Sequence, residues 1–168
     1  QRGNELSATV WQVCAIAAGV LFVVLMNYFR ALTARTGAVQ WTAFARSMGL
    51  IFSTTLLVSA ALRGVIGRMV KVDGEPLPGL EVLRYSTALN YNLIGSVTMT
   101  ALGLTILAVS VVILRTLVLA KWFGYVGLVC SAIILAASAA TVGHYTIIFS
   151  LLWALCLSVP ICRQPAPG

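Results

Sequence analysis

The chain has 168 residues, of which 60% are hydrophobic and only 9% are charged, and its mean hydropathy is +1.00. A soluble domain carries about 25% charged residues, so this composition excludes an ordinary water-soluble protein. The net charge of +7 comes from basic residues that stand singly or in pairs beside apolar runs. This pattern indicates anchoring at lipid headgroups and excludes a phosphate-binding groove for nucleic acid.

The first apolar run predicts a membrane-spanning helix near residues 6–29, because about 20 helical residues cross the hydrocarbon core of a bilayer. Asn27, Tyr28 and Arg30 mark the interfacial end of this run, since aromatic and basic residues prefer that level. Thr36-Gly37 is the expected turn that follows.

The second predicted helix, near 46–67, is the least regular of the set. Only 16 uncharged residues run from Ser47 to Leu62, which is about 24 Å of helix. Arg46 and Arg63 can extend this span, because long basic side chains reach outward to the interface.

The third stretch is a polar loop over 68–84. Its centre contains two prolines and two glycines, which oppose a continuous helix. It also holds three of the four acids, Asp73, Glu75 and Glu81. We expect this loop to lie in water. A short hairpin is an alternative, because VKVDG alternates and Asp-Gly favours tight turns.

Three further helices are predicted near 90–114, 120–141 and 145–162. The apolar run from Lys121 to Cys162 is too long for one crossing. We therefore expect it to fold back at residues 141–144, where Gly143 permits a turn. Together these stretches predict a single transmembrane domain over 1–168, an all-α polytopic integral membrane bundle of about five helices.

The orientation follows from the basic residues, with a small margin. Six Lys or Arg lie on the side of loop 30–46, the connection 115–121 and the C-terminal tail, against five on the other side. The first side has no acid. We expect it, and with it the C-terminus, to be cytoplasmic, and the 68–84 loop to be outside.

No catalytic or metal-binding motif is present in the sequence. No predicted span has a charge near its middle, which argues against an ion-coupled transporter. His144 is the only histidine, so a bis-histidine haem site is excluded and a turn histidine at the interface is favoured over a single axial ligand. The cysteines show no zinc-type spacing. We predict no cofactor, although bound lipid is compatible with the composition.

Small residues in the predicted fourth helix indicate close helix packing. Ala132, Ala136 and Ala140 recur every four residues, and Gly127 and Ser131 form a neighbouring pair. Such spacing lets another helix approach closely. We expect the alanine stripe to face protein, with packing inside the chain favoured over packing between chains.

Polar residues near the start of the predicted third helix could line a path for a neutral molecule. They are Asn90, Asn92, Thr98, Thr100 and Thr105. Caps or interhelical hydrogen bonds are the commoner role of asparagine at a helix entrance.

The stretch from Lys121 to Gly127, KWFGYVG, is followed by a small-residue helix, a brief turn and a last helix with Leu152-Trp153. Over roughly 90–163 this resembles the bacterial six-helix membrane proteins of domain-of-unknown-function family 4386. Those proteins often have Pro-x-Trp-Leu-Gly-Trp-x-Gly here, whereas this chain has Ala120, Phe123 and Tyr125 at three of these positions. The resemblance implies a further helix before Gln1, a bacterial inner membrane and a cytoplasmic C-terminus. It implies no activity.

These observations favour a non-enzymatic membrane protein, an accessory or structural subunit that packs against other membrane proteins or copies of itself. The alternative is a carrier or channel for a neutral or lipid-like molecule. A third hypothesis is a membrane enzyme whose catalytic groups precede Gln1. The expected partners are the lipid bilayer and other membrane subunits, with no nucleic acid.

Overall fold

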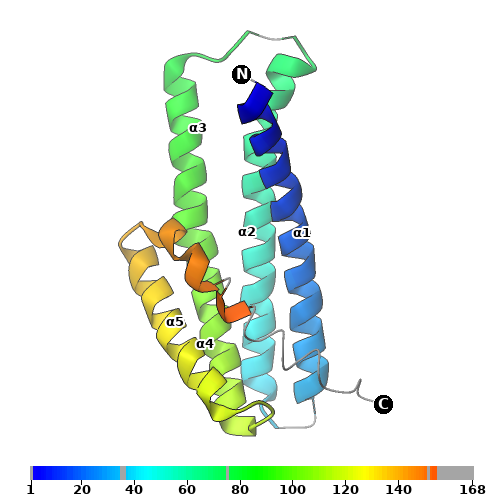
Figure 1. Ribbon diagram of the computed structural model, residues 1–168, viewed down its shortest axis with the longest axis vertical. Helices are drawn as coiled ribbons and strands as arrows, with labels where there is room; N and C mark the ends of the chain where they lie inside the picture. The colour runs from blue at the N-terminus through cyan, green and yellow to red at the C-terminus, as the bar shows by residue number, and fades with distance from the viewer. Residues whose placement is uncertain (1, 35–36, 75, 151, 155–168) are drawn as a thin grey trace.

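The computed structural model describes residues 2–34, 37–74, 76–150 and 152–154. Over these residues the chain is an all-α bundle without strands, which confirms the predicted fold class (Figure 1). Four helical stretches are long and apolar enough to cross a membrane: Gln12–Thr33, Val39–Val70, Leu80–Thr116 and Lys121–Ala139.

Helices α1 (Arg2–Thr33) and α2 (Val39–Lys71) form an antiparallel pair. The turn between them contains Gly37, whose φ of 74° is easily adopted only by glycine. Both helices are longer than the predicted 6–29 and 46–67. Their added turns carry exposed charged residues such as Arg30 and Arg68, and a charge does not end a helix that emerges into water.

The connection after α2 is shorter than the predicted 68–84 loop. Helix α2 continues to Lys71, and α3 (Leu80–Asn92) begins directly after Gly79. The break is therefore confined to the Gly- and Pro-rich centre, where Gly74 has a φ of 68°. Val72 has helical backbone angles, so the hairpin alternative is not found among the described residues.

Helices α3 and α4 (Met99–Thr116) form one long rod, joined by a π-helical segment, η1, at Leu93–Thr98. The predicted third helix at 90–114 therefore begins ten residues earlier, at Leu80. A π segment inserts one extra residue into a helical turn, and here it changes the faces that the two halves of the rod present.

Helix α5 (Lys121–Ala139) runs back along α4, close to its predicted bounds of 120–141 (Figure 1). The chain then turns at Thr141, with a φ of 61°, and enters the short 3₁₀ helix η2 (Gly143–Thr146). The predicted break at 141–144 is present. Residues 147–150 and 152–154 are helical. The rest of the predicted helix at 145–162 lies outside the described residues.

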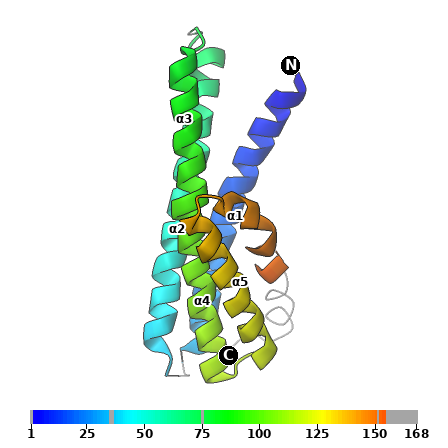
Figure 2. The ribbon, with the colours of Figure 1, turned by 90° about the vertical axis from the view of Figure 1, so that its left-hand side faces the viewer.

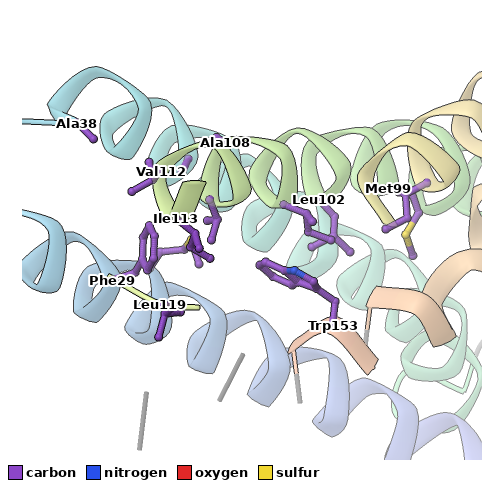
Figure 3. Close-up of a cluster of buried hydrophobic side chains, with 14 of the residues drawn as sticks. Phe29, Ala38, Met99, Leu102, Ala108, Val112, Ile113, Leu119 and Trp153 are labelled. Atoms are coloured by element: carbon purple, nitrogen blue, oxygen red, sulfur yellow. The ribbon is translucent and has the colours of Figure 1, made fainter. Parts of the chain in front are cut away.

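The core is built around α4. In the most apolar part of Leu80–Thr116, 67% of the residues are buried, against 22% in Val39–Val70 and 28% in Lys121–Ala139. Side chains from α1, α4 and the last helical residues meet there, among them Phe29, Leu102, Ile113 and Trp153 (Figure 3). Away from this core the N-terminal half of α1 leans away from α2 and α3 (Figure 2).

Candidate functional site

Polar side chains gather where α2 faces α3 and η1. This polar seam consists of Thr55, Ser59 and Arg63 on α2, with Asn90 and Thr98 on the facing rod. Ser59, Asn90 and Thr98 are buried, at 0%, 5% and 0% exposure. Polar groups inside an apolar bundle must be hydrogen-bonded, so their partners decide what the seam can do.

Asn90 is the centre of the upper part of the seam. One orientation of its amide satisfies both ends: the nitrogen donates to Ser59 Oγ and to Ser59 O at 3.3 Å, and the oxygen accepts from Arg63 Nε at 2.6 Å. Arg63 is exposed, and its Nε contacts Asn90 on the facing helix. Its reach toward the membrane interface stays a prediction. A guanidinium donor strengthens this contact, because hydrogen bonds with one charged partner are stronger than neutral ones.

Thr98 is the centre of the lower part. Its hydroxyl lies 3.0 Å from Thr55 Oγ1 across the helix pair, and 3.0 Å from Leu93 O within its own rod. Leu93 is five residues before Thr98, so this bond spans the π turn. Thr55 lies near the midpoint of the Val39–Val70 stretch, and the seam therefore reaches the middle of the span.

The seam is thus a set of interhelical bonds, and none of its residues lines the three clefts described below. Asn92, the other predicted asparagine, is exposed and bonds Ser96 on its own rod at 3.0 Å. Thr105 is buried and bonds Ala101 O at 2.8 Å. Thr100 lines a shallow groove with Ser96. The structure brings only Asn90 and Thr98 of the predicted lining residues into the seam.

An open cleft of about 670 Å³ lies beside η1, lined by Tyr91, Asn92, Thr141 and Tyr145. It is the place where Asn92 meets residues that follow α5. The four side chains offer hydroxyl, amide and aromatic groups but no charge. This cleft could take a small neutral molecule at the surface of the bundle.

Helix α5 packs on α4 through glycine and serine. Gly124, Gly127, Ser131, Ile134 and Ser138 are buried, so the predicted packing residues Gly127 and Ser131 lie on the inner face of α5. A Cβ on Gly127 would overlap with Ser110 Oγ and lie 2.8 Å from Trp153 Nε1. Only glycine fits at this distance between the two helices.

The predicted alanine stripe is not part of this contact. Ala132, Ala136 and Ala140 are exposed in the part of the chain that the structure describes. Ala136 follows Gly127 by nine residues, about two and a half turns, so the two point in opposite directions. The expectation of packing inside the chain is therefore wrong for the described residues. Four-residue spacing marks a common face but does not say which neighbour it meets.

Gly143 has a different role from the predicted one. The left-handed backbone of the turn is at Thr141. A Cβ on Gly143 would instead collide with Gly95 O of the π segment and lie 2.9 Å from Ser138 Oγ. Its missing side chain permits close approach of η2 to η1. The side chain of His144 lies outside the described residues.

The described residues hold no group of three or more His, Cys, Asp or Glu that could bind a metal ion. Cys14 and Cys130 are not in disulfides, and Cys156 and Cys162 lie outside the described residues.

The sequence did not predict the hydrogen-bond partners of Asn90 and Thr98. It also did not predict the π segment. Ser59 and Thr55 stand four apart in an uncharged run, and this spacing on one helix face was the available signal. The π segment has no comparable signal, since LIGSVT reads as ordinary helix.

Comparison with known proteins finds no matching family model, no matching curated protein and no matching solved structure.

Proposed function

We propose that the chain is a non-enzymatic integral membrane protein, an accessory subunit that packs through the outer face of α5 against another membrane protein or a second copy of itself. The helices that support a membrane location are the four apolar ones already described. The family resemblance further supports a bacterial inner membrane with a cytoplasmic C-terminus.

The observation that carries the proposal is the outward direction of the small-residue stripe. Ala132, Ala136 and Ala140 lie on the side of α5 opposite its contact with α4. Lipid tails pack as well beside leucine as beside alanine, so a smooth stripe brings no advantage toward lipid. A neighbouring helix gains from it, because its backbone comes closer and makes more dispersion contacts.

The state of the polar seam is consistent with this reading. A carrier for a neutral molecule needs polar groups that face its path, whereas Asn90 and Thr98 bond other helices of the bundle. The cleft at Tyr91 and Asn92 is the observation that favours the carrier alternative. It lies between the end of α3, which carries Tyr91 and Asn92, and the segment after α5, which carries Thr141 and Tyr145.

Three leucine substitutions of alanine test the subunit proposal. Ala136→Leu changes the stripe, Ala17→Leu changes an exposed position on α1, and Ala101→Leu changes a buried position on α4. After mild detergent extraction from the native membrane, the complex size is measured by native mass spectrometry and the protomer by thermal unfolding.

We expect Ala136→Leu to dissociate the complex while changing protomer stability by less than about 0.5 kcal/mol. Ala17→Leu should change neither property. Ala101→Leu should destabilise the protomer by about 1–3 kcal/mol through overpacking. The proposal is wrong if the unsubstituted protein extracts only as a monomer, or if its complex survives Ala136→Leu.

A cysteine at Gly74 tests the proposed orientation in a background without the native cysteines. A membrane-impermeant thiol label on intact cells should react, because the 72–79 connection is then outside. Reaction only after permeabilisation would place this connection, and not the C-terminus, in the cytoplasm.

A further inference from the structure

A basic cleft lies between the adjoining ends of α1 and α2. Figure 1 shows these two helix ends at the bottom of the bundle. Its volume is about 360 Å³, and its lining includes Arg30 and Arg46, one from each helix. Thr33 and Thr42 lie on its floor, and Val39 and Leu50 contribute apolar surface. Both arginines are exposed.

In the part of the chain that the structure describes, no acidic side chain lines this cleft. The whole chain has four acids, Glu5, Asp73, Glu75 and Glu81. Glu5 is in the first turns of α1, roughly 38 Å of helix away from Arg30. Asp73 and Glu81 lie in the connection after α2 and in the first turn of α3, at the far end of α2, and Glu75 is outside the described residues.

The hydroxyl groups of the cleft are already used to join the helices. Thr33 Oγ1 and Thr42 Oγ1 lie 3.2 Å apart, so one hydroxyl donates to the other, and the accepting hydroxyl donates to the backbone carbonyl four residues before it. Ser47 donates to Ala43 O at 3.1 Å. The Thr33–Thr42 bond joins α1 to α2 beside the two arginines, whereas the Ser47 bond stays within α2. The guanidinium groups remain as the donors of the cleft.

A phosphate group fits this arrangement. Guanidinium presents paired N–H donors that match phosphate oxygens, and two of them on facing helices can bind one anion from both sides. The cleft lies at the ends of the Gln12–Thr33 and Val39–Val70 stretches, where headgroups meet a membrane-spanning helix. Val39 and Leu50, 64% and 44% exposed, suit the glycerol and upper acyl carbons of a lipid.

We propose that this cleft binds a phosphate group, carried by an anionic phospholipid or present as free phosphate, through Arg30 and Arg46. The inference does not depend on the subunit proposal, because the cleft and the alanine stripe lie on different helices.

Lipid retention on the purified full chain tests the proposal. Phosphatidylglycerol and zwitterionic phosphatidylcholine are titrated against the protein in detergent, and bound lipid is counted by native mass spectrometry. The variants are Arg30→Gln with Arg46→Gln, and the matched pair Arg68→Gln with Arg84→Gln. The second pair removes the same charge from exposed positions at the opposite end.

We expect the unsubstituted protein to prefer phosphatidylglycerol. The Arg30/Arg46 double variant should lose about 25-fold in affinity, since one basic residue contributes about five-fold at an anionic surface. The Arg68/Arg84 variant should keep its affinity. Equal affinity in all three proteins, or an equal loss in both double variants, would overturn the proposal.

Two further measurements separate the sources of the phosphate and guard against misfolding. Competition by millimolar inorganic phosphate indicates a free anion as ligand, and retention of phosphatidylglycerol under the same conditions indicates the lipid. The pair Arg30→Lys with Arg46→Lys keeps the charge but removes the planar donors. It should show intermediate affinity, and affinity as low as that of the glutamine pair in a folded protein would contradict a role for charge.

Discussion

The α4–α5 contact and the α2–α3 contact join neighbouring helices of one bundle by different means. Between α4 and α5 the helices approach so closely that Gly103, Gly124 and Gly127 each leave no room for a Cβ. Between α2 and α3–η1, buried hydroxyl and amide groups bond across the interface. The α4–α5 contact depends on glycines, whose lack of a side chain permits close approach. The α2–α3 contact depends on polar side chains that form hydrogen bonds.

This difference illustrates the two ways in which helices associate where water is absent. Apolar side chains gain little from leaving lipid for protein, so close backbone packing or interhelical hydrogen bonds must hold the bundle together. A close-packed contact should tolerate almost no added volume. A hydrogen-bonded contact should tolerate added volume at its edges but not the loss of a donor.

The largest effect should come from adding one methyl group at Gly143. In Gly143→Ala the new Cβ meets the Gly95 carbonyl, a backbone atom that cannot rotate away. We expect the free energy of unfolding, measured by SDS titration in mixed micelles, to fall by about 3 kcal/mol. Gly79→Ala is the control, because nothing lies within 4 Å of its Cβ position. A loss equal to that of the control would show that η2 does not pack on η1.

The polar seam should respond to loss of the Asn90 amide. Asn90→Leu leaves Ser59 and Arg63 without their shared partner, and we expect a loss of about 1–2 kcal/mol in the same titration. Asn92→Leu makes the identical change two residues later, at an exposed position whose bond to Ser96 stays within one rod. It should cost less than about 0.5 kcal/mol. Equal costs for the two variants would mean that the seam contributes nothing.

The smallest effect should come from Thr98→Val, which removes a hydroxyl and keeps the shape. Interhelical hydrogen bonds in membranes contribute about 0.6 kcal/mol on average, and Thr98 loses its bonds to Thr55 and Leu93 O. Thr87→Val is the control, because Thr87 is exposed and bonds only Leu83 O of its own helix. If Thr98→Val is as stable as Thr87→Val, the bonds of Thr98 to Thr55 and Leu93 O do not contribute to the free energy of unfolding.

Hydrophobic run lengths predicted most of the fold. The apolar runs predicted helices α4 and α5. Glycines between the runs predicted the turn at Gly37 and the break near Thr141. Helix ends were less predictable at Lys71 and Leu80, because a charged residue is equally compatible with a helix in water and with a loop.

The site was less predictable for a geometric reason. Gly127 and Ser131 were recognised as packing residues, but the direction of the alanine stripe depends on which face of α5 meets α4. Asn90 was recognised as polar and notable, but its bond to Ser59 joins residues 31 apart. The sequence does not encode such pairs locally, and only the packing of the helices brings them together.

A double-mutant cycle on Ser59 and Asn90 tests most directly whether the polar seam is a structural joint. The two alanine substitutions are made singly and together, and the free energy of unfolding is measured for all four proteins. We predict that the single losses do not add, with a coupling of about 0.6–1.7 kcal/mol. Fully additive losses, or single variants that are as stable as the unsubstituted protein, would show that the Ser59–Asn90 bond does not stabilise the bundle. Asn90 would then be a candidate ligand-binding residue again.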